Sequence, residues 1–187
     1  MSNMNAGIDK ILISHQQIAQ RIKQLAAQIT ADHSTVYLAG GEITIVPIMT
    51  GAMIFTSDLI RQIPIAMKIG LMLVSSYPGN SVQTRGSQML ANQVGEVRGR
   101  HVLVVDDILD SGGTIHMVVP ALREMGAASV KSCVLLRKDR PTARAVHVDY
   151  VGFEIPDKFV VGYGLDYNDY YRNLPDIVTL KEPVLAT

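Results

Sequence analysis

The amino-acid sequence predicts an α/β fold in which helices flank a central, mainly parallel sheet, within one domain that spans residues 1–187. The first observation is the order of patterns, because short apolar runs of strand length alternate with stretches whose apolar residues repeat at helical spacing. The second is the run Val102–Val105, which is apolar at every position, as is typical of a strand buried on both faces of a parallel sheet. The third is composition, since 48% apolar residues in a chain of 187 suffice for one ordinary core.

Each element follows from its own local pattern. Ser14 and Gln17 form a capping box, which begins a helix whose apolar face recurs at helical spacing. The Gly40-Gly41 pair separates two apolar runs of strand length, and Gly126 is placed to end the last predicted helix. The expected strands are 10–13, 36–39, 43–49, 66–74, 102–105 and 130–137, and the expected helices are 14–31, 52–61 and 115–125.

Charge and composition exclude several classes of protein. The formal net charge is zero with a pI near 7.0, so the basic footprint of a nucleic-acid-binding protein is absent. The single cysteine, Cys133, permits neither an intramolecular disulfide nor a cysteine-rich zinc site. No apolar run approaches the roughly 20 residues that span a bilayer, and the first residues do not resemble a signal peptide. We therefore expect a cytoplasmic protein that binds neither nucleic acid nor a membrane.

The most informative stretch follows the run Val102–Val105. Three carboxylates come first, and small and hydroxyl residues then lead into the helical spacing that starts at Ile115. The carboxylates are Asp106, Asp107 and Asp110, and the small and hydroxyl residues are Ser111, Gly112, Gly113 and Thr114. This order predicts a buried strand, a short loop and a helix that begins among residues able to approach a ligand closely.

The chemistry of this stretch points to a particular kind of ligand. The free N–H groups and positive dipole end of a helix favour an anion, and two hydroxyls add donors. Carboxylates would repel phosphate alone, but they accept hydrogen bonds from sugar hydroxyls and bind Mg²⁺. The stretch therefore predicts a ligand with phosphate, sugar hydroxyls and a divalent cation. The alternative, an acidic loop that merely caps a helix, requires one Asp or Ser rather than this whole set.

The stretch HVLVVDDILDSGGT resembles the 5-phosphoribosyl-1-pyrophosphate (PRPP) signature of type I phosphoribosyltransferases. The resemblance implies the fold of that family, with a small hood built from about residues 1–35 and 140–187 over the sheet. It implies that Asp106 and Asp107 face the ribose hydroxyls and Mg²⁺, and that residues 110–114 hold the 5′-phosphate. Asp106 stands where Glu is common in the family, which shortens the reach by one methylene but keeps the charge.

A second stretch, VPIMTGA, is a strand end followed by a turn into a helix. Thr50 and Gly51 would present backbone N–H groups at the edge of the sheet where ligands of open α/β sheets bind. In purine phosphoribosyltransferases this turn cradles the pyrophosphate, and the resemblance implies a cis peptide bond between Met49 and Thr50. Many relatives carry Lys or Arg where this chain has Thr50, so here only the backbone would contact the pyrophosphate at this turn.

Residues 75–87 form a long polar loop, SSYPGNSVQTRGS. Loops of this length within one domain are either lids or disordered connections. In the resembling family a Ser-Tyr pair in such a loop closes over the substrates, which implies this role for Ser76 and Tyr77 in a mobile loop.

The tail carries the closest likeness, because VGFEIPDKFVVGYGLDY followed by YRNLP is similar to the hypoxanthine-guanine phosphoribosyltransferases. The resemblance implies that Lys138 donates to the purine 6-oxo group, that Phe159 stacks on the ring and that Val160 reads the base through its carbonyl. It further implies that Asp166 belongs to the residues that read the base and holds a second Mg²⁺, and that Arg172 contacts pyrophosphate.

The implied activity is transfer of the phosphoribosyl group from PRPP to N9 of hypoxanthine or guanine, with Asp110 as the general base that takes the N7 proton. The products are IMP or GMP and pyrophosphate, the cofactor is Mg²⁺, and the assembly is a homodimer or homotetramer. A xanthine-preferring enzyme stays open, because no residue predicted here decides the contacts around the purine 2-position. A regulator that senses PRPP is a further alternative, although it would be expected to carry a basic face or a DNA-binding domain.

Overall fold

The computed structural model describes residues 7–75 and 88–181, which form two sheets and five helices. The helices are α1 (His15–Asp32), α2 (Ser34–Leu38), α3 (Met53–Ile60), α4 (Gly113–Glu124) and α5 (Pro141–Arg144). The strands are β1 (Ile8–Ile13), β2 (Ile43–Met49), β3 (Met67–Ile69), β4 (Leu71–Ser75), β5 (Gln88–Gln93), β6 (His101–Leu109), β7 (Ser129–Lys138), β8 (Tyr150–Ile155), β9 (Val160–Val161) and β10 (Ile177–Leu180).

The main sheet has seven strands in the order β5-β4-β2-β6-β7-β8, with β3 also paired to β2. Every neighbouring pair is parallel except β4 and β5. The predicted α/β class with a mainly parallel sheet is therefore confirmed. Because parallel strands end at the same edge, the segments that follow β2, β6, β7 and β8 lie near one another there.

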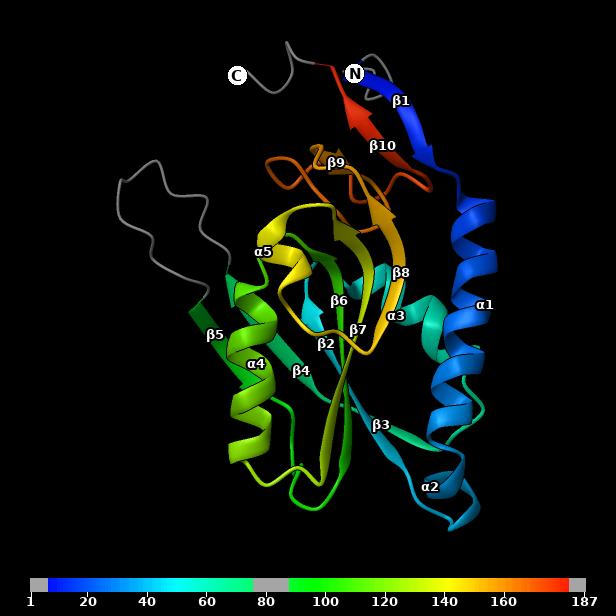
Figure 1. Ribbon diagram of the computed structural model, residues 1–187, viewed down its shortest axis with the longest axis vertical. Helices are drawn as coiled ribbons and strands as arrows, with labels where there is room; N and C mark the ends of the chain where they lie inside the picture. Colours follow the sequence, from blue (N-terminus) through cyan, green and yellow to red (C-terminus); the bar gives the residue numbers. More distant parts are fainter. Residues whose placement is uncertain (1–6, 76–87, 182–187) are drawn as a thin grey trace.

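Helices cover both faces of this sheet, and the alternating side chains of the apolar run in β6 pack against helices on opposite faces. Leu103 and Val105 belong to the cluster that includes α1 and α3, whereas Val102 and Val104 belong to the cluster that includes α4. All four side chains are fully buried. In Figure 1 the strands lie between α4 on the left and α1 on the right. Burial on both faces thus explains why the run has no polar residue.

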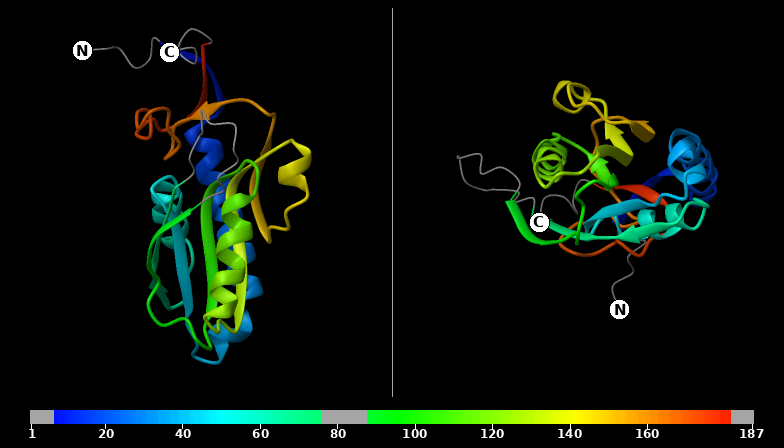
Figure 2. Two further views of the ribbon diagram at one scale, coloured as in Figure 1. Left: turned by 90° about the vertical axis from the view of Figure 1, so that its left-hand side faces the viewer. Right: turned by 90° about the horizontal axis from the view of Figure 1, so that it is seen from below.

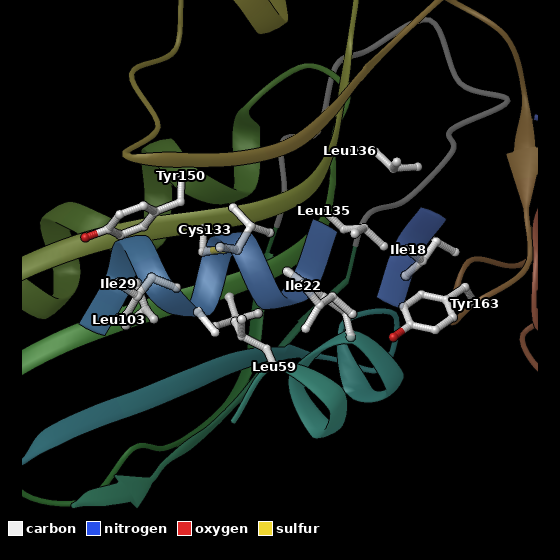
Figure 3. Packing of buried hydrophobic residues seen from close by; sticks show 14 of the residues in the cluster. Ile18, Ile22, Ile29, Leu59, Leu103, Cys133, Leu135, Leu136, Tyr150 and Tyr163 are labelled. Carbon is white, nitrogen blue, oxygen red and sulfur yellow. The ribbon is translucent and has the colours of Figure 1, made fainter. Parts of the chain in front are cut away.

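The larger hydrophobic cluster packs α1 against α3 and against strands β6 and β7 of the main sheet. Figure 3 shows Ile22 and Ile29 of α1 near Leu59 of α3, Leu103 of β6 and Cys133 of β7. Burial raises the pKa of the Cys133 thiol, so the thiol stays protonated, as expected for an unreactive core cysteine. The predicted capping box is also present, because Ser14 N–H donates to Gln17 Oε1 at 2.9 Å and the Ser14 side chain accepts from the Gln17 N–H.

A second sheet of three strands, in the order β1-β10-β9, combines the first and last described strands of the chain. β1 and β10 are antiparallel, with Ile11 opposite Val178 and Ile13 opposite Ile177. Figures 1 and 2 place these two strands beyond one end of the main sheet. The residue boundaries predicted for the hood stay a prediction.

The strand predicted at 36–39 is wrong, because residues 36–38 form part of a short helix, α2. Gly40, with φ of 71°, ends this helix, and the Gly41 N–H donates to the Val36 carbonyl at 2.8 Å. A left-handed residue followed by this bond is the common glycine termination of a helix. The glycine pair therefore acts as a helix end rather than as a turn between two strands.

Two further strands differ from their predicted extents. The strand predicted at 66–74 is divided into β3 and β4 at Gly70, where an added Cβ would collide with the backbone of Val94. The strand predicted at 102–105 continues to Leu109, which pairs with Arg137 of β7. The sequence patterns also missed β5, α5, β8, β9 and β10. Among residues 7–75 and 88–181, no helix is long and apolar enough to cross a membrane.

Candidate active site

Asp106 and Asp107 lie on β6 rather than in the loop after it, so the strand itself fixes their positions. Burial, together with the negative charge of Asp107, raises the pKa of Asp106 well above its usual value. Burial also raises the pKa of Asp107, although the positive charge of Arg172 acts in the opposite direction. A cation placed beside this pair would favour the charged form of both carboxylates.

The loop after β6 leads into α4 through Gly112, which has a φ of 84° and accepts from the His116 N–H at 2.9 Å. A side chain at Gly112 would collide with Val146, so both the conformation and the space require glycine. No side chain caps the start of α4 in the described structure, so its first N–H groups are available to an anion. Ser111 is exposed, and Thr114 lies at the second position of the helix.

The turn after β2 lies directly against the acidic pair. The peptide bond between Met49 and Thr50 is cis, which confirms the expectation for this turn. A Cβ at Gly51 would collide with the Asp107 carboxylate, and a Cβ at Gly164 would collide with the Gly51 carbonyl oxygen. The turn is therefore held between β6 and the segment that follows β9.

Asp110 belongs to a cluster of four charged side chains, with Lys138, Arg140 and Asp157. Lys138, the last residue of β7, donates to Asp110 Oδ2 at 3.0 Å, and Arg140 donates to Asp110 Oδ1. Arg140 also donates to both oxygens of Asp157, at 2.7 and 2.6 Å from Nη2. These bonds from Arg140 hold the pKa of Asp157 below its usual value. The cluster has two cations and two carboxylates, so its formal charge is zero.

The segment after β9 is folded around Arg172. The Arg172 guanidinium contacts Asp166 at 2.8 Å and Asp169 at 3.1 Å, and it donates to the Gly164 carbonyl at 2.8 Å. The Asp169 N–H donates to Asp166 at 2.9 Å, which closes the turn between them. The positive charge of Arg172 also lowers the pKa of Asp107, so Arg172 and the acidic pair belong to the same edge of the sheet.

Phe159 and Val160 begin the segment that crosses to the small sheet. Phe159 is 42% exposed, and its ring meets Tyr167 edge to face, with 5.6 Å between the ring centres. An aromatic ring that is partly open to solvent can accept a planar ligand on its exposed surface. Val160 is buried in β9, opposite Thr179 of β10, so the adjacent main chain is held in place by the small sheet.

The structure thus brings most of the predicted residues to one edge of the main sheet. In the described part of the chain, no three acidic, histidine or cysteine side chains form one cluster that could hold a metal ion. Asp106 and Asp107 are adjacent on β6, and Asp166 forms an ion pair with Arg172. Ser76 and Tyr77 lie outside the described residues.

Sequence patterns missed Arg140 and Asp157, which complete the cluster around Asp110. Their separation of 17 residues equals that of Arg137 and Glu154, which also form an ion pair. Had β8 been predicted beside β7, opposite charges at this repeated separation would have indicated both pairs.

Comparison with known proteins agrees with this geometry. The model of the phosphoribosyl transferase domain matches residues 9–168. A hypoxanthine-guanine phosphoribosyltransferase from Streptococcus pneumoniae is 41% identical over 181 residues, covering 96% of this chain and 97% of that protein. The enzyme of this name from Bacillus subtilis is 39% identical over 184 residues, covering 97% of this chain and 98% of its own.

Solved structures give the same result. A hypoxanthine phosphoribosyltransferase from Staphylococcus aureus has a TM-score of 0.88 at 35% identity and covers 100% of both chains. A mutant of the Trypanosoma cruzi hypoxanthine phosphoribosyltransferase, complexed with its product IMP, has a TM-score of 0.83 at 35% identity and covers 96% of this chain and 93% of that one. The chain therefore belongs to the phosphoribosyltransferase family, in the group of the hypoxanthine-guanine phosphoribosyltransferases.

Proposed function

We propose that this protein is a purine salvage enzyme that transfers the 5-phosphoribosyl group from PRPP to N9 of hypoxanthine or guanine, yielding IMP or GMP and pyrophosphate. The observation that carries the proposal is the placement of an acidic pair, an uncapped helix start and the Lys138–Asp110 pair at one edge of the sheet. These are the groups that a sugar phosphate, its cation and an oxopurine require together.

The phosphates would bind at two places. The loop 110–114 and the first N–H groups of α4 would hold the 5′-phosphate, since both donors and dipole favour an anion there. Thr50 and Gly51 would hold the pyrophosphate through their backbone, and Arg172 would add a positive charge beside them. Asp106 and Asp107 would accept hydrogen bonds from the ribose hydroxyls.

Asp106 and Asp107 would also hold Mg²⁺, and Asp166 would contribute to a second ion. When bound, the metal neutralises charge that develops on the departing pyrophosphate. The separation of the negative leaving group from the positive ribose is the step at which fixed donors and charges are most effective.

The purine would lie against the exposed face of Phe159, with the carbonyl of Val160 at its edge. Lys138 would donate to the 6-oxo group, which favours oxopurines because the exocyclic amine of adenine does not accept that bond. As N9 attacks C1′, Asp110 would accept the N7 proton. We also propose a cytoplasmic location and assembly as a homodimer or homotetramer.

The test is the initial rate of nucleotide formation with PRPP, Mg²⁺ and each of hypoxanthine, guanine, xanthine and adenine. Rapid reaction of hypoxanthine and guanine and none of adenine would support both the chemistry and the role of Lys138. A higher rate with xanthine would favour the xanthine-preferring alternative. Tight PRPP binding without reaction of any base would favour the PRPP-sensing regulator.

A further inference from the structure

The four-residue cluster around Asp110 contains one cation more than the proposed reaction uses. Lys138 is assigned to the purine and Asp110 to the proton, whereas Arg140 and Asp157 have no role so far. Each oxygen of Asp110 accepts a hydrogen bond from a different residue: Oδ1 from Arg140, and Oδ2 from Lys138 at 3.0 Å. Arg140 therefore holds the Asp110 carboxylate independently of Lys138.

We propose that Arg140 is a positioning residue that holds Asp110 in place while Lys138 moves from Asp110 to the purine. The proposal rests on the proposed function. When Lys138 donates to the 6-oxo group, its ammonium shares its positive charge between that oxygen and Asp110 Oδ2, so its hydrogen bond to Oδ2 weakens as the base enters. Arg140 keeps Oδ1 fixed through this exchange, and Oδ2 becomes free to accept the N7 proton.

The anchoring of Arg140 explains why it can remain while Lys138 leaves. Its Nε lies 3.1 Å from Asp157 Oδ2, and its Nη2 donates to both oxygens of the same carboxylate. Arg140 thus spans the segment after β7 and the segment after β8, and its remaining nitrogen reaches Asp110. A guanidinium can bridge two carboxylates in this way because its donors are fixed in one plane, whereas an ammonium has a single nitrogen.

Loss of Arg140 would affect the two neighbouring residues differently. Lys138 lies 3.0 Å from Asp110 and 3.7 Å from Asp157, so it would become the sole nearby cation in the described structure for both carboxylates. Held by both, it would be less available to the purine. Asp110 would lose its fixed orientation whenever Lys138 did leave. PRPP binding depends mainly on backbone N–H groups and on the acidic pair, which Arg140 does not contact in the described structure, so it should be preserved.

The experiment compares the wild type with Arg140→Ala and Arg140→Lys in steady-state assays with PRPP and hypoxanthine. For Arg140→Ala we expect kcat to fall between about fivefold and fiftyfold, within the range for a misplaced catalytic group. The KM for hypoxanthine should rise several-fold, roughly as a weakened charge-assisted hydrogen bond would give, while the KM for PRPP stays unchanged. Arg140→Lys should give an intermediate kcat, since it restores the charge but not the bridge.

The matched control is Arg137→Ala. Arg137 pairs with Glu154 across the same two strands at the same separation, and its side-chain exposure of 26% is close to the 34% of Arg140. Among the described residues, the Arg137 side chain forms hydrogen bonds and an ion pair with Glu154 and with no residue of the proposed reaction. The kcat of Arg137→Ala should therefore remain within about twofold of the wild type, the effect of a surface pair alone. Asp157→Asn should lower kcat in the same direction as Arg140→Ala but less, because it only releases the anchor.

A kcat for Arg140→Ala that equals that of Arg137→Ala would overturn the proposal, and so would equal losses for PRPP and hypoxanthine. Thermal unfolding midpoints of all variants separate misfolding from a change in the site. A wild type that reacts with no base overturns the proposed function and this inference together. An active wild type with an unaffected Arg140→Ala overturns the inference alone.

Discussion

Replacing Asp110 with asparagine should reduce turnover far more than it reduces stability. Asp110 is 45% exposed and forms ion pairs with Lys138 and Arg140. A partly exposed pair contributes about 0.2–1 kcal/mol, so the loss of both destabilises the fold by at most about 2 kcal/mol. For a chain of this length that corresponds to a fall in the unfolding midpoint of at most about 4–8 °C.

The effect on catalysis depends on whether residue 110 can accept a proton. Asparagine preserves the shape of the side chain and still accepts a hydrogen bond from Lys138 or Arg140, but its amide does not take a proton from N7 near neutral pH. Loss of a general base reduces the rate by about 10²–10⁴-fold. PRPP affinity should fall much less than turnover, because the backbone N–H groups of the loop 110–114, the turn after β2 and the acidic pair are unchanged.

The assay combines the initial rate of IMP formation with calorimetric titration of PRPP and Mg²⁺. Asp157→Asn is the control, since Asp157 pairs with the same two cations and is 42% exposed. It should lose similar stability but only a few-fold in turnover, an effect transmitted through a misplaced residue rather than a lost base. Similar losses of turnover and PRPP affinity in Asp110→Asn would refute the assignment of Asp110 as the base. Equal turnover losses in the two variants would refute it as well.

Three other predictions concern the site and the stability of the fold. Gly51→Ala should lower turnover at least tenfold, because the new methyl group collides with Asp107 and forces a shift that costs about 1–3 kcal/mol; initial rates against wild type measure this. Thr44→Val should raise the free energy of unfolding by about 1 kcal/mol in urea titrations, since the buried Thr44 hydroxyl has no partner among the described residues. The backbone N–H of His15, at 2.7 Å, and its ring lower the pKa of Asp176, so this contribution to stability is present above the unfolded pKa and is lost as the pH falls through the lower folded value. Asp176→Asn should therefore show a smaller decrease in unfolding midpoint than the wild type as the pH is lowered below about 4.

Local patterns predicted those parts of the fold that depend on neighbouring residues. The capping box at Ser14 and the apolar run of β6 each have one physical explanation, and both are present in the structure. The cis peptide between Met49 and Thr50 was predicted from the resemblance to the family, because no local sequence pattern predicts it. Asp106 and Asp107 were predicted to follow the strand, whereas they lie within it, because β6 continues to Leu109.

Features that depend on distant contacts were not predictable in this way. α2 has an apolar composition that suits a strand, and its identity is decided by the helix end at Gly40. The division between β3 and β4 depends on the close approach of Val94 to Gly70. The bridge from Arg140 to Asp110 and Asp157 joins three segments, so it could not be inferred before β8 was placed beside β7. Long-range pairing therefore supplied the unexpected part of the site.

The pairing of β1 with β10 has a consequence for the order in which activity appears during synthesis. A ribosome releases residues 8–13 first, yet their partner strand is made about 165 residues later, which takes roughly 10–30 s at usual elongation rates. Until then, β9 lacks the strand that it pairs with, and the segment carrying Phe159 and Arg172 lacks one of its main supports. The main sheet can form earlier, because its last strand ends at Ile155. Nascent chains should therefore acquire a folded body well before they acquire a purine site, and truncation before β10 should yield a compact but inactive protein.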